Sequence, residues 1–201
     1  LGHLLAWLAG ASLTLTFAPF NLWPFALVSF PALVLLCQQL EGKALFIRSW
    51  MYGFGLFGSG TWWVYISIHT YGYTPPVLAI PFTLFFTGGI ALLFGFQLLL
   101  YRRLSGQGFS PWVFAACWVL FEWIRSWLLT GFPWLYVGYS QLNTPLAGYA
   151  PVLGIYGVSF LLVLTASLLG QSLLFAIRQP RYFQRIAFNL TLITLIWVCG
   201  Q

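Results

Sequence analysis

Apolar residues run along this chain in seven long stretches, and short polar or proline-rich connections separate them. A helix that crosses a bilayer needs about 20 predominantly apolar residues at a rise of about 1.5 Å per residue. The stretches approach this length, so the pattern predicts an all-α polytopic membrane protein with about seven transmembrane helices. The predicted spans are residues 1–17, 25–40, 45–68, 77–101, 111–129, 151–177 and 186–200.

The composition agrees with a membrane protein and argues against a soluble domain. Of the 201 residues, 61% are hydrophobic and only 5% are charged, whereas a soluble domain carries about 25% charged residues. Two acidic and eight basic residues are too few to solvate a globular surface. The net charge of +6 does not indicate a nucleic acid partner, because the basic residues are scattered between apolar stretches and form no stripe.

The basic residues lie on one side of the predicted membrane. The connections after the second, fourth and sixth spans hold seven of the eight, and those after the first, third and fifth hold none. The positive-inside rule places the basic side in the cytoplasm. We therefore expect a cytoplasmic N-terminus and an outward-facing Gln201. The seven basic residues are Lys43, Arg48, Arg102, Arg103, Arg178, Arg181 and Arg185.

The sequence TGFPWLYVGYSQ, residues 130–141, interrupts the apolar pattern after the fifth span. Pro133 lacks an amide donor and two glycines loosen the backbone, so a regular helix does not continue here. The rings of Trp134 and Tyr139 suit the headgroup level of a bilayer. The sequence therefore predicts an irregular outer loop at the membrane interface. An ordinary interfacial connector is the alternative.

Glu122 and Arg125 are charged residues inside the fifth predicted span. They stand three residues apart and so share one helix face, and Glu122 is the only acid within a span. Each charge alone would cost about 2.5–3.5 kcal/mol in hydrocarbon on insertion scales. Two interpretations stay open. The residues form either a polar patch that binds a phospholipid headgroup or orders the outer loop, or a structural pair between helices.

Small residues line one face of the third predicted span. Ser49, Gly53 and Gly60 fall at steps of four and seven, and Gly55 and Ser59 add a second pair of small residues four apart. Faces of this kind let helices approach closely. We interpret the pattern as a packing surface.

Catalytic and metal-binding groups are not predicted within this chain. Cys37, Cys117 and Cys199 lie in separate apolar stretches without metal-ligand spacing, and His3 and His69 are isolated. Two acids cannot supply both acid–base chemistry and an activated nucleophile. We expect no catalytic residue, metal site or cofactor in these 201 residues.

Four stretches together resemble the apolipoprotein N-acyltransferase family: FAPFNLWP, GFGLFGSGTWWVYISIH, FEWIRSWLLTGFPWLYVGYSQ and PLAGYAPVLGIYGVSFL. They occur in the family's order and cover most of residues 17–161. The resemblance implies that residues 1–201 form the membrane domain of an eight-span enzyme of the bacterial inner membrane. A nitrilase-like catalytic domain is then expected after Gln201, on the periplasmic side, and the 201 residues are expected to be a fragment of a longer protein.

The resemblance also implies an activity for the whole protein. Family members transfer an acyl chain from a phospholipid donor to the N-terminal diacylglyceryl-cysteine of an apolipoprotein, through a thioester on a catalytic cysteine. Glutamate and lysine complete that triad, which this chain lacks, and its three cysteines do not match the nucleophile.

Four residues are the expected substrate-binding set. Trp134, within GFPW, matches a tryptophan of functional interest in the family, and Glu122 and Arg125 match its E-x-x-R pattern. Tyr139 is added because it stands in the same outer loop. A small membrane transporter and a non-catalytic membrane anchor are the alternative functions. A transporter fits less well, because only the fifth span holds buried charges and no inverted repeat is visible.

Overall fold

The computed structural model describes residues 1–106, 108–178 and 182–201. Within these ranges the chain forms helices and turns and no strand, which confirms the predicted all-α class. Arg181, one of the basic residues assigned to the cytoplasmic side, lies outside the described residues. The α-helices are α1 (Gly2–Leu13), α2 (Pro24–Cys37), α3 (Gly42–Gly60), α4 (Trp63–Ile66), α5 (Pro76–Ser105), α6 (Pro111–Arg125), α7 (Ala150–Arg178) and α8 (Phe183–Cys199).

Shorter helical turns connect several of these helices. A π-helical turn follows α4, and 3-10 turns follow α1 and fill much of the segment between α6 and α7. The turns are η1 (Thr14–Thr16), η2 (Ser67–Tyr71), η3 (Leu128–Thr130), η4 (Val137–Gln141) and η5 (Pro145–Tyr149).

The third predicted span differs most from the structure, because its helix is broken. Helix α3 stops at Gly60, and Thr61 leaves the helical conformation with φ −124° and ψ 23°. The Thr61 hydroxyl donates to the carbonyl of Phe57 at 2.7 Å, which caps the helix end. Glycines at the end of α3 have low helix propensity, which favours a break there. The continuous apolar pattern of this stretch gave no sign of the break before α4.

Two helical segments are long and apolar enough to cross a membrane, judged by length and composition: Pro76–Ser105 and Pro145–Ile177. Helices α2 and α8 are apolar but shorter. Seven membrane crossings therefore stay a prediction.

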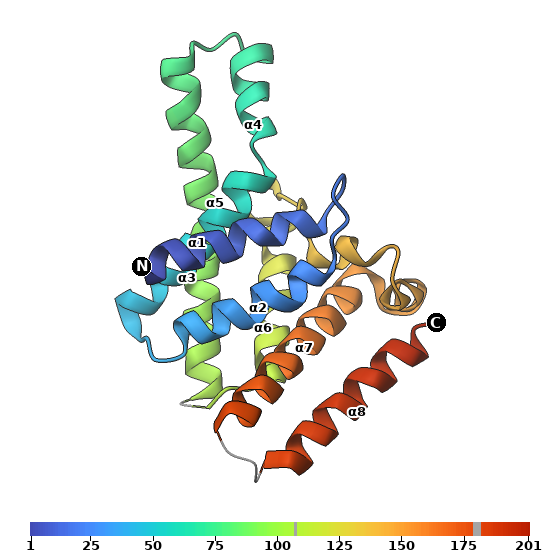
Figure 1. Ribbon diagram of the computed structural model, residues 1–201. Helices are drawn as coiled ribbons and strands as arrows, with labels where there is room; N and C mark the ends of the chain where they lie inside the picture. Colours follow the sequence, from blue (N-terminus) through green and yellow to red (C-terminus); the bar gives the residue numbers. More distant parts are fainter. Residues whose placement is uncertain (107, 179–181) are drawn as a thin grey trace.

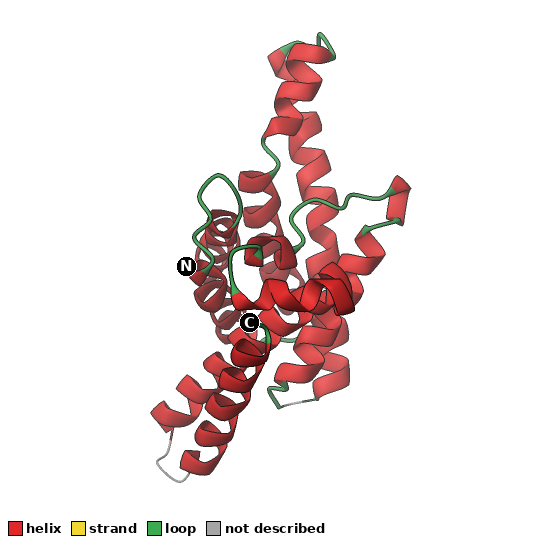
Figure 2. Ribbon diagram, turned by 90° about the vertical axis from the view of Figure 1, so that its right-hand side faces the viewer, coloured by secondary structure: helices red, strands yellow, loops and turns green. Residues whose placement is uncertain are grey.

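The helices form one packed body from which α4 and the start of α5 rise side by side (Figures 1 and 2). Helix α3 packs against α1 and α5, and α7 packs against α2, α6 and α8. Figure 1 places the α2–α3 turn, the end of α5 and the end of α7 toward the lower left. The connection after η1, the segment between α6 and α7 and the C-terminus lie toward the right.

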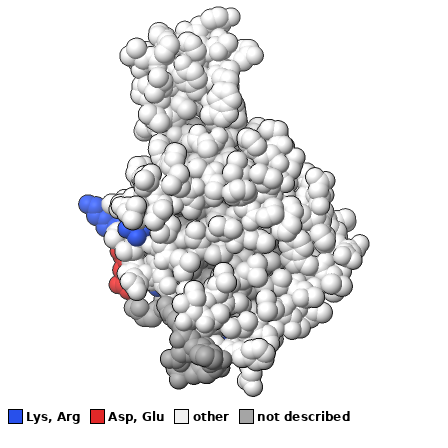
Figure 3. Space-filling model, in the orientation of Figure 1, with Lys and Arg blue, Asp and Glu red and all other residues white. Residues whose placement is uncertain are grey.

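Charged side chains are concentrated at one edge of the face shown in Figure 3, and the rest of its described surface is uncharged. This edge lies beside the start of α1 and the α2–α3 turn, which carries Glu41 and Lys43. A surface with so few charges agrees with an apolar surrounding.

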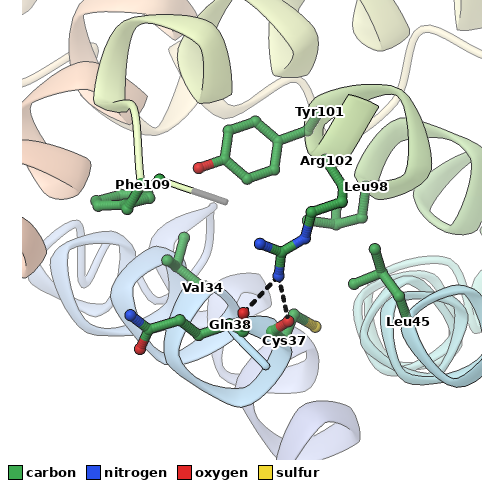
Figure 4. Close-up of a pocket in the computed structure, with 9 residues that line it drawn as sticks. Val34, Cys37, Gln38, Leu45, Leu98, Tyr101, Arg102 and Phe109 are labelled. Carbon is green, nitrogen blue, oxygen red and sulfur yellow. Dashed lines mark hydrogen bonds between the residues drawn. The ribbon is translucent and has the colours of Figure 1, made fainter. Parts of the chain in front are cut away.

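Arg102 joins the end of α5 to the end of α2. Its guanidinium donates to the carbonyls of Cys37, at 3.1 Å, and of Gln38 (Figure 4). The last carbonyls of a helix lack partners within that helix, and a cation near them is stabilising. We therefore assign Arg102 a structural role as a cap for α2.

Glycines bring α1 and α3 into backbone contact, which confirms the packing interpretation of the small residues. A Cβ atom at Gly55 would lie 2.0 Å from the carbonyl oxygen of Trp7, and one at Gly10 would lie 1.9 Å from that of Tyr52. Neither position has room for a methyl group. Gly53 allows α5 to approach α3 closely, because a Cβ atom at Gly53 would meet the ring of Phe94 on α5 at 2.7 Å.

The contact between α1 and α3 gives the first prediction. Gly55→Ala forces two helix backbones apart and is expected to lower the free energy of unfolding by about 1–3 kcal/mol, as overpacking does. Gly58→Ala is the matched control on the same helix, because nothing lies within 4 Å of a Cβ there. Thermal unfolding in detergent measures both. Equal melting temperatures for the two variants would show that the close approach does not exist.

Candidate functional site

The segment between α6 and α7 has an unusual backbone. Helix α6 ends at Arg125, whose carbonyl accepts a hydrogen bond from the amide of Phe132 at 2.8 Å. Leu129, Thr130 and Leu135 have positive φ angles of 53°, 77° and 59°. Each such conformation costs a non-glycine residue about 1–3 kcal/mol and persists only where the surroundings hold it. Residues 126–149, which we call the outer segment after the side of the membrane predicted for them, are therefore held in place by contacts with the helices.

Glu122 supplies one of these contacts. Its side chain is only 4% exposed. Its Oε1 atom accepts hydrogen bonds from the backbone amide of Val137, at 2.8 Å, and from Nε1 of Trp118, at 3.1 Å. The next amide, that of Gly138, donates to the hydroxyl of Ser159 on α7 at 2.9 Å. Of the two interpretations of Glu122, this geometry favours the ordering of the outer segment.

Arg125 supplies a second contact and is 5% exposed. Its Nη2 atom donates to the carbonyl of Leu135 at 3.5 Å. Its guanidinium carbon lies 5.0 Å from the ring centre of Phe57 and 4.9 Å from that of Tyr136. Buried cation–π contacts of this kind contribute about 2 kcal/mol or more each. Both charged side chains therefore bind the stretch that contains the left-handed Leu135.

The two charges are not joined by a hydrogen bond in the part of the chain that the structure describes. Oε2 of Glu122 and Nη1 of Arg125 are both buried and lack a hydrogen-bond partner there. They lie on one helix, as the spacing predicted, but each uses its remaining atoms to hold the outer segment. A simple structural pair between helices does not describe them.

Trp134 is linked to Arg125 through aromatic rings. The ring of Phe57 packs against Phe132 with centres 6.2 Å apart, and Phe132 stacks on Trp134 at 5.4 Å with an angle of 24°. Trp63 of α4 also contacts Trp134, at 5.6 Å. Half of the Trp134 side chain is nevertheless exposed. Its ring is thus positioned by neighbours and still accessible.

Tyr139 is linked to Arg125 through Tyr136. The two tyrosine rings are nearly parallel, at 5°, with centres 6.3 Å apart. Tyr139 is half exposed, whereas Tyr136 is buried. Burial raises the pKa of Tyr136 to about 12, so its phenol stays neutral near neutral pH. Trp134 and Tyr139 are thus each linked to Arg125 through one of the two rings that it contacts, and Glu122 lies three residues before Arg125 on α6.

A cavity of about 660 Å³ lies beside Arg125, between α4, α5 and the segment 128–132. Drug-sized ligands occupy cavities of about 300–1,000 Å³. Its walls are almost entirely apolar, and Arg125 is the only charged side chain among the described residues that line it. Such a space can hold an apolar chain with an anionic group near the guanidinium. Aromatic lining residues include Trp63, Phe85, Phe86, Phe96 and Phe132.

Several residues of this site were not predicted from the sequence. The spacing of four residues between Trp118 and Glu122 indicates a shared helix face and could have identified Trp118. Phe57 and Phe132 belong to distant segments, and their sequence carries no signal for this contact. In the described ranges, no three His, Cys, Asp or Glu residues lie close enough to hold a metal ion.

Comparisons with known proteins identify the family of this chain. Residues 9–168 match the family profile of the apolipoprotein N-acyltransferase N-terminal domain. The chain is 48% identical over 172 residues to an apolipoprotein N-acyltransferase of Pseudomonas putida, covering 84% of this chain and 34% of the relative. It is 44% identical over 206 residues to the enzyme of that name in Pseudomonas aeruginosa, covering 99% of this chain and 39% of the relative.

A relative from another genus gives a similar match. The apolipoprotein N-acyltransferase of Coxiella burnetii is 46% identical over 167 residues, covering 80% of this chain and 34% of the relative. The chain thus spans between about a third and two fifths of the length of these relatives. On the strength of the profile match and these identities, the chain belongs to the apolipoprotein N-acyltransferase family.

Proposed function

We propose that this chain is the membrane domain of an enzyme that transfers an acyl chain from a phospholipid to the N-terminal diacylglyceryl-cysteine of apolipoproteins. Membership of the family supports the reaction class. The relatives extend well beyond the matched part, which agrees with a nitrilase-like catalytic domain after residue 201. That domain would bring the Glu–Lys–Cys triad, and the membrane domain would bring the lipid substrates to it.

The apolar cavity with one buried cation is the observation that carries this proposal. An acyl chain of the donor would occupy the space between α4 and α5, and its phosphate would lie toward Arg125. Trp134 is half exposed and packs on Trp63 and Phe132 in the cavity wall, and Tyr139 is half exposed in the same segment. Both rings would contact the lipid substrates. Glu122 would act as a positioning residue, because its carboxylate holds the segment that carries both rings.

We further propose that the domain spans the bacterial inner membrane about seven times, with a cytoplasmic N-terminus and a periplasmic outer segment. The arrangement of the basic residues supports this orientation. The α2–α3 turn and the end of α5, which carry Lys43, Arg102 and Arg103, lie on one side of the body (Figure 1). The segment between α6 and α7 lies on the opposite side and contains no Lys or Arg.

A small transporter and a non-catalytic anchor are less well supported than the acyltransferase. Neither explains the family match over 9–168. Neither requires a half-exposed Trp134 held beside an apolar cavity.

Thiol labelling tests the proposed orientation. In a background without native cysteines, single cysteines at Asn21, Tyr73 and Asn143 are expected to react with a membrane-impermeant reagent added to spheroplasts. Cysteines at Ala44 and Leu104 are expected to react only after lysis. The reverse pattern would show that the domain is inserted the other way round.

The role of Trp134 is tested in the protein expressed from the full coding sequence. Trp134→Ala removes a large apolar contact surface and is expected to slow acyl transfer by about tenfold, equivalent to about 1.4 kcal/mol, with the melting temperature unchanged. Two assays separate the half-reactions: thioester formation from phospholipid, and transfer to a diacylated lipopeptide.

Trp127→Ala is the matched control for this experiment. Trp127 is exposed to a similar degree, at 53% against 50% for Trp134, but its ring packs on Trp123, whereas that of Trp134 packs on Trp63 and Phe132, which line the cavity. It is expected to leave both half-reactions unchanged. Normal rates for Trp134→Ala in both assays would contradict a role for Trp134 in substrate contact and would show that the outer segment is a simple connector.

A further inference from the structure

Three buried polar side chains surround one small cavity between α5 and α6. They are Gln97, Glu122 and Arg125, and each is at most 5% exposed. Nε2 of Gln97, Oε2 of Glu122 and Nη1 of Arg125 have no hydrogen-bond partner among the described residues. The remaining walls are apolar and include Leu56, Leu93, Phe94, Trp118, Phe121 and Leu135.

These three buried atoms need a hydrogen-bond partner. A buried polar atom that makes no hydrogen bond is expensive, more so when it is charged, and natural proteins keep few of them. Here three occur around a single space, and two of them belong to ionisable groups. Something with both donor and acceptor capacity is needed to satisfy a carboxylate oxygen and two N–H groups together.

The size of the cavity restricts what this partner is. The water-accessible space is about 10 Å³, close to the minimum of about 10–15 Å³ that one buried water molecule needs. A lipid headgroup or a hydrated ion is far larger. A bare metal cation would face the N–H groups of Gln97 and Arg125 and is excluded by charge and by hydrogen-bond polarity.

We propose that one ordered water molecule occupies this cavity and joins Gln97, Glu122 and Arg125. The water accepts hydrogen bonds from Nε2 of Gln97 and Nη1 of Arg125 and donates one to Oε2 of Glu122. Three hydrogen bonds are the usual number for a buried water. The carboxylate and the guanidinium, which share no direct hydrogen bond, are thereby connected through the water.

This water gives Gln97 a role as a positioning residue. It extends the support of the outer segment from α6 to α5, because Glu122 binds the water with one oxygen and the amide of Val137 with the other. Gln97 then contributes to holding the outer segment without touching it. The water supports the fold itself, and its presence does not depend on the proposed acyl transfer.

A high-resolution map of the protein expressed from the full coding sequence tests the proposal directly. We expect a density peak within hydrogen-bond distance of the Gln97 amide, the Glu122 carboxylate and the Arg125 guanidinium. A map that resolves other buried waters but shows no peak at this position would overturn the proposal. This measurement needs no variant and does not require activity.

A double-mutant cycle tests the coupling that the water creates. Gln97→Met is expected to lower the melting temperature by several degrees in the native background, and by less than half as much in a Glu122→Gln background. Equal losses in the two backgrounds would contradict the bridge.

Thr87→Val is the control for this cycle. Thr87 is a buried polar residue on the same helix, but its hydroxyl bonds within that helix, to the carbonyls of Thr83 and Leu84. We expect the loss it causes to be the same in both backgrounds. A loss that depends on Glu122 as strongly as that of Gln97→Met would show that the cycle reports general destabilisation and would overturn the bridge.

Discussion

The burial of two charges inside apolar helices is the constraint on which the outer part of this domain depends. An unpaired buried charge costs several kcal/mol, so Glu122 and Arg125 must each find partners nearby. They find them mainly in the segment that follows α6. Glu122 accepts from the amide of Val137, and Arg125 donates to the carbonyl of Leu135 and lies against the ring of Tyr136. The contacts that satisfy these two charges are therefore the same contacts that fix the shape of the segment.

These contacts explain why a strained backbone is tolerated in this segment. Leu135 has a positive φ, which a bulky side chain adopts only under constraint. Charge-assisted hydrogen bonds to the Leu135 carbonyl and from the Val137 amide offset that cost. The same contacts place the Phe132–Trp134 stack beside the apolar cavity and leave the Tyr139 ring accessible. The site that we propose for an amphiphilic substrate is thus formed by groups that mostly bind other parts of the protein.

The sequence predicted the parts of the structure that depend on local pattern. Apolar stretches identified the helices, small residues identified a packing face on α3, and the scarcity of charged residues within the spans drew attention to Glu122 and Arg125. It did not predict the break at Thr61, which depends on the glycines ending α3, or the partners of the two charges. Phe57 and Gln97 join the site only because the fold brings distant segments together, and no local pattern marks such residues.

Hydrogen exchange at the Val137 amide is the most direct test of the central claim that Glu122 fixes the outer segment. We expect slow exchange in the native protein and, in Glu122→Ala, exchange that is faster by about tenfold or more, which corresponds to about 1.4 kcal/mol. Glu122→Gln keeps an acceptor oxygen and is expected to lie between the two. Unchanged exchange at Val137 in Glu122→Ala, or an equal increase at the distant turn 72–75, would contradict this claim.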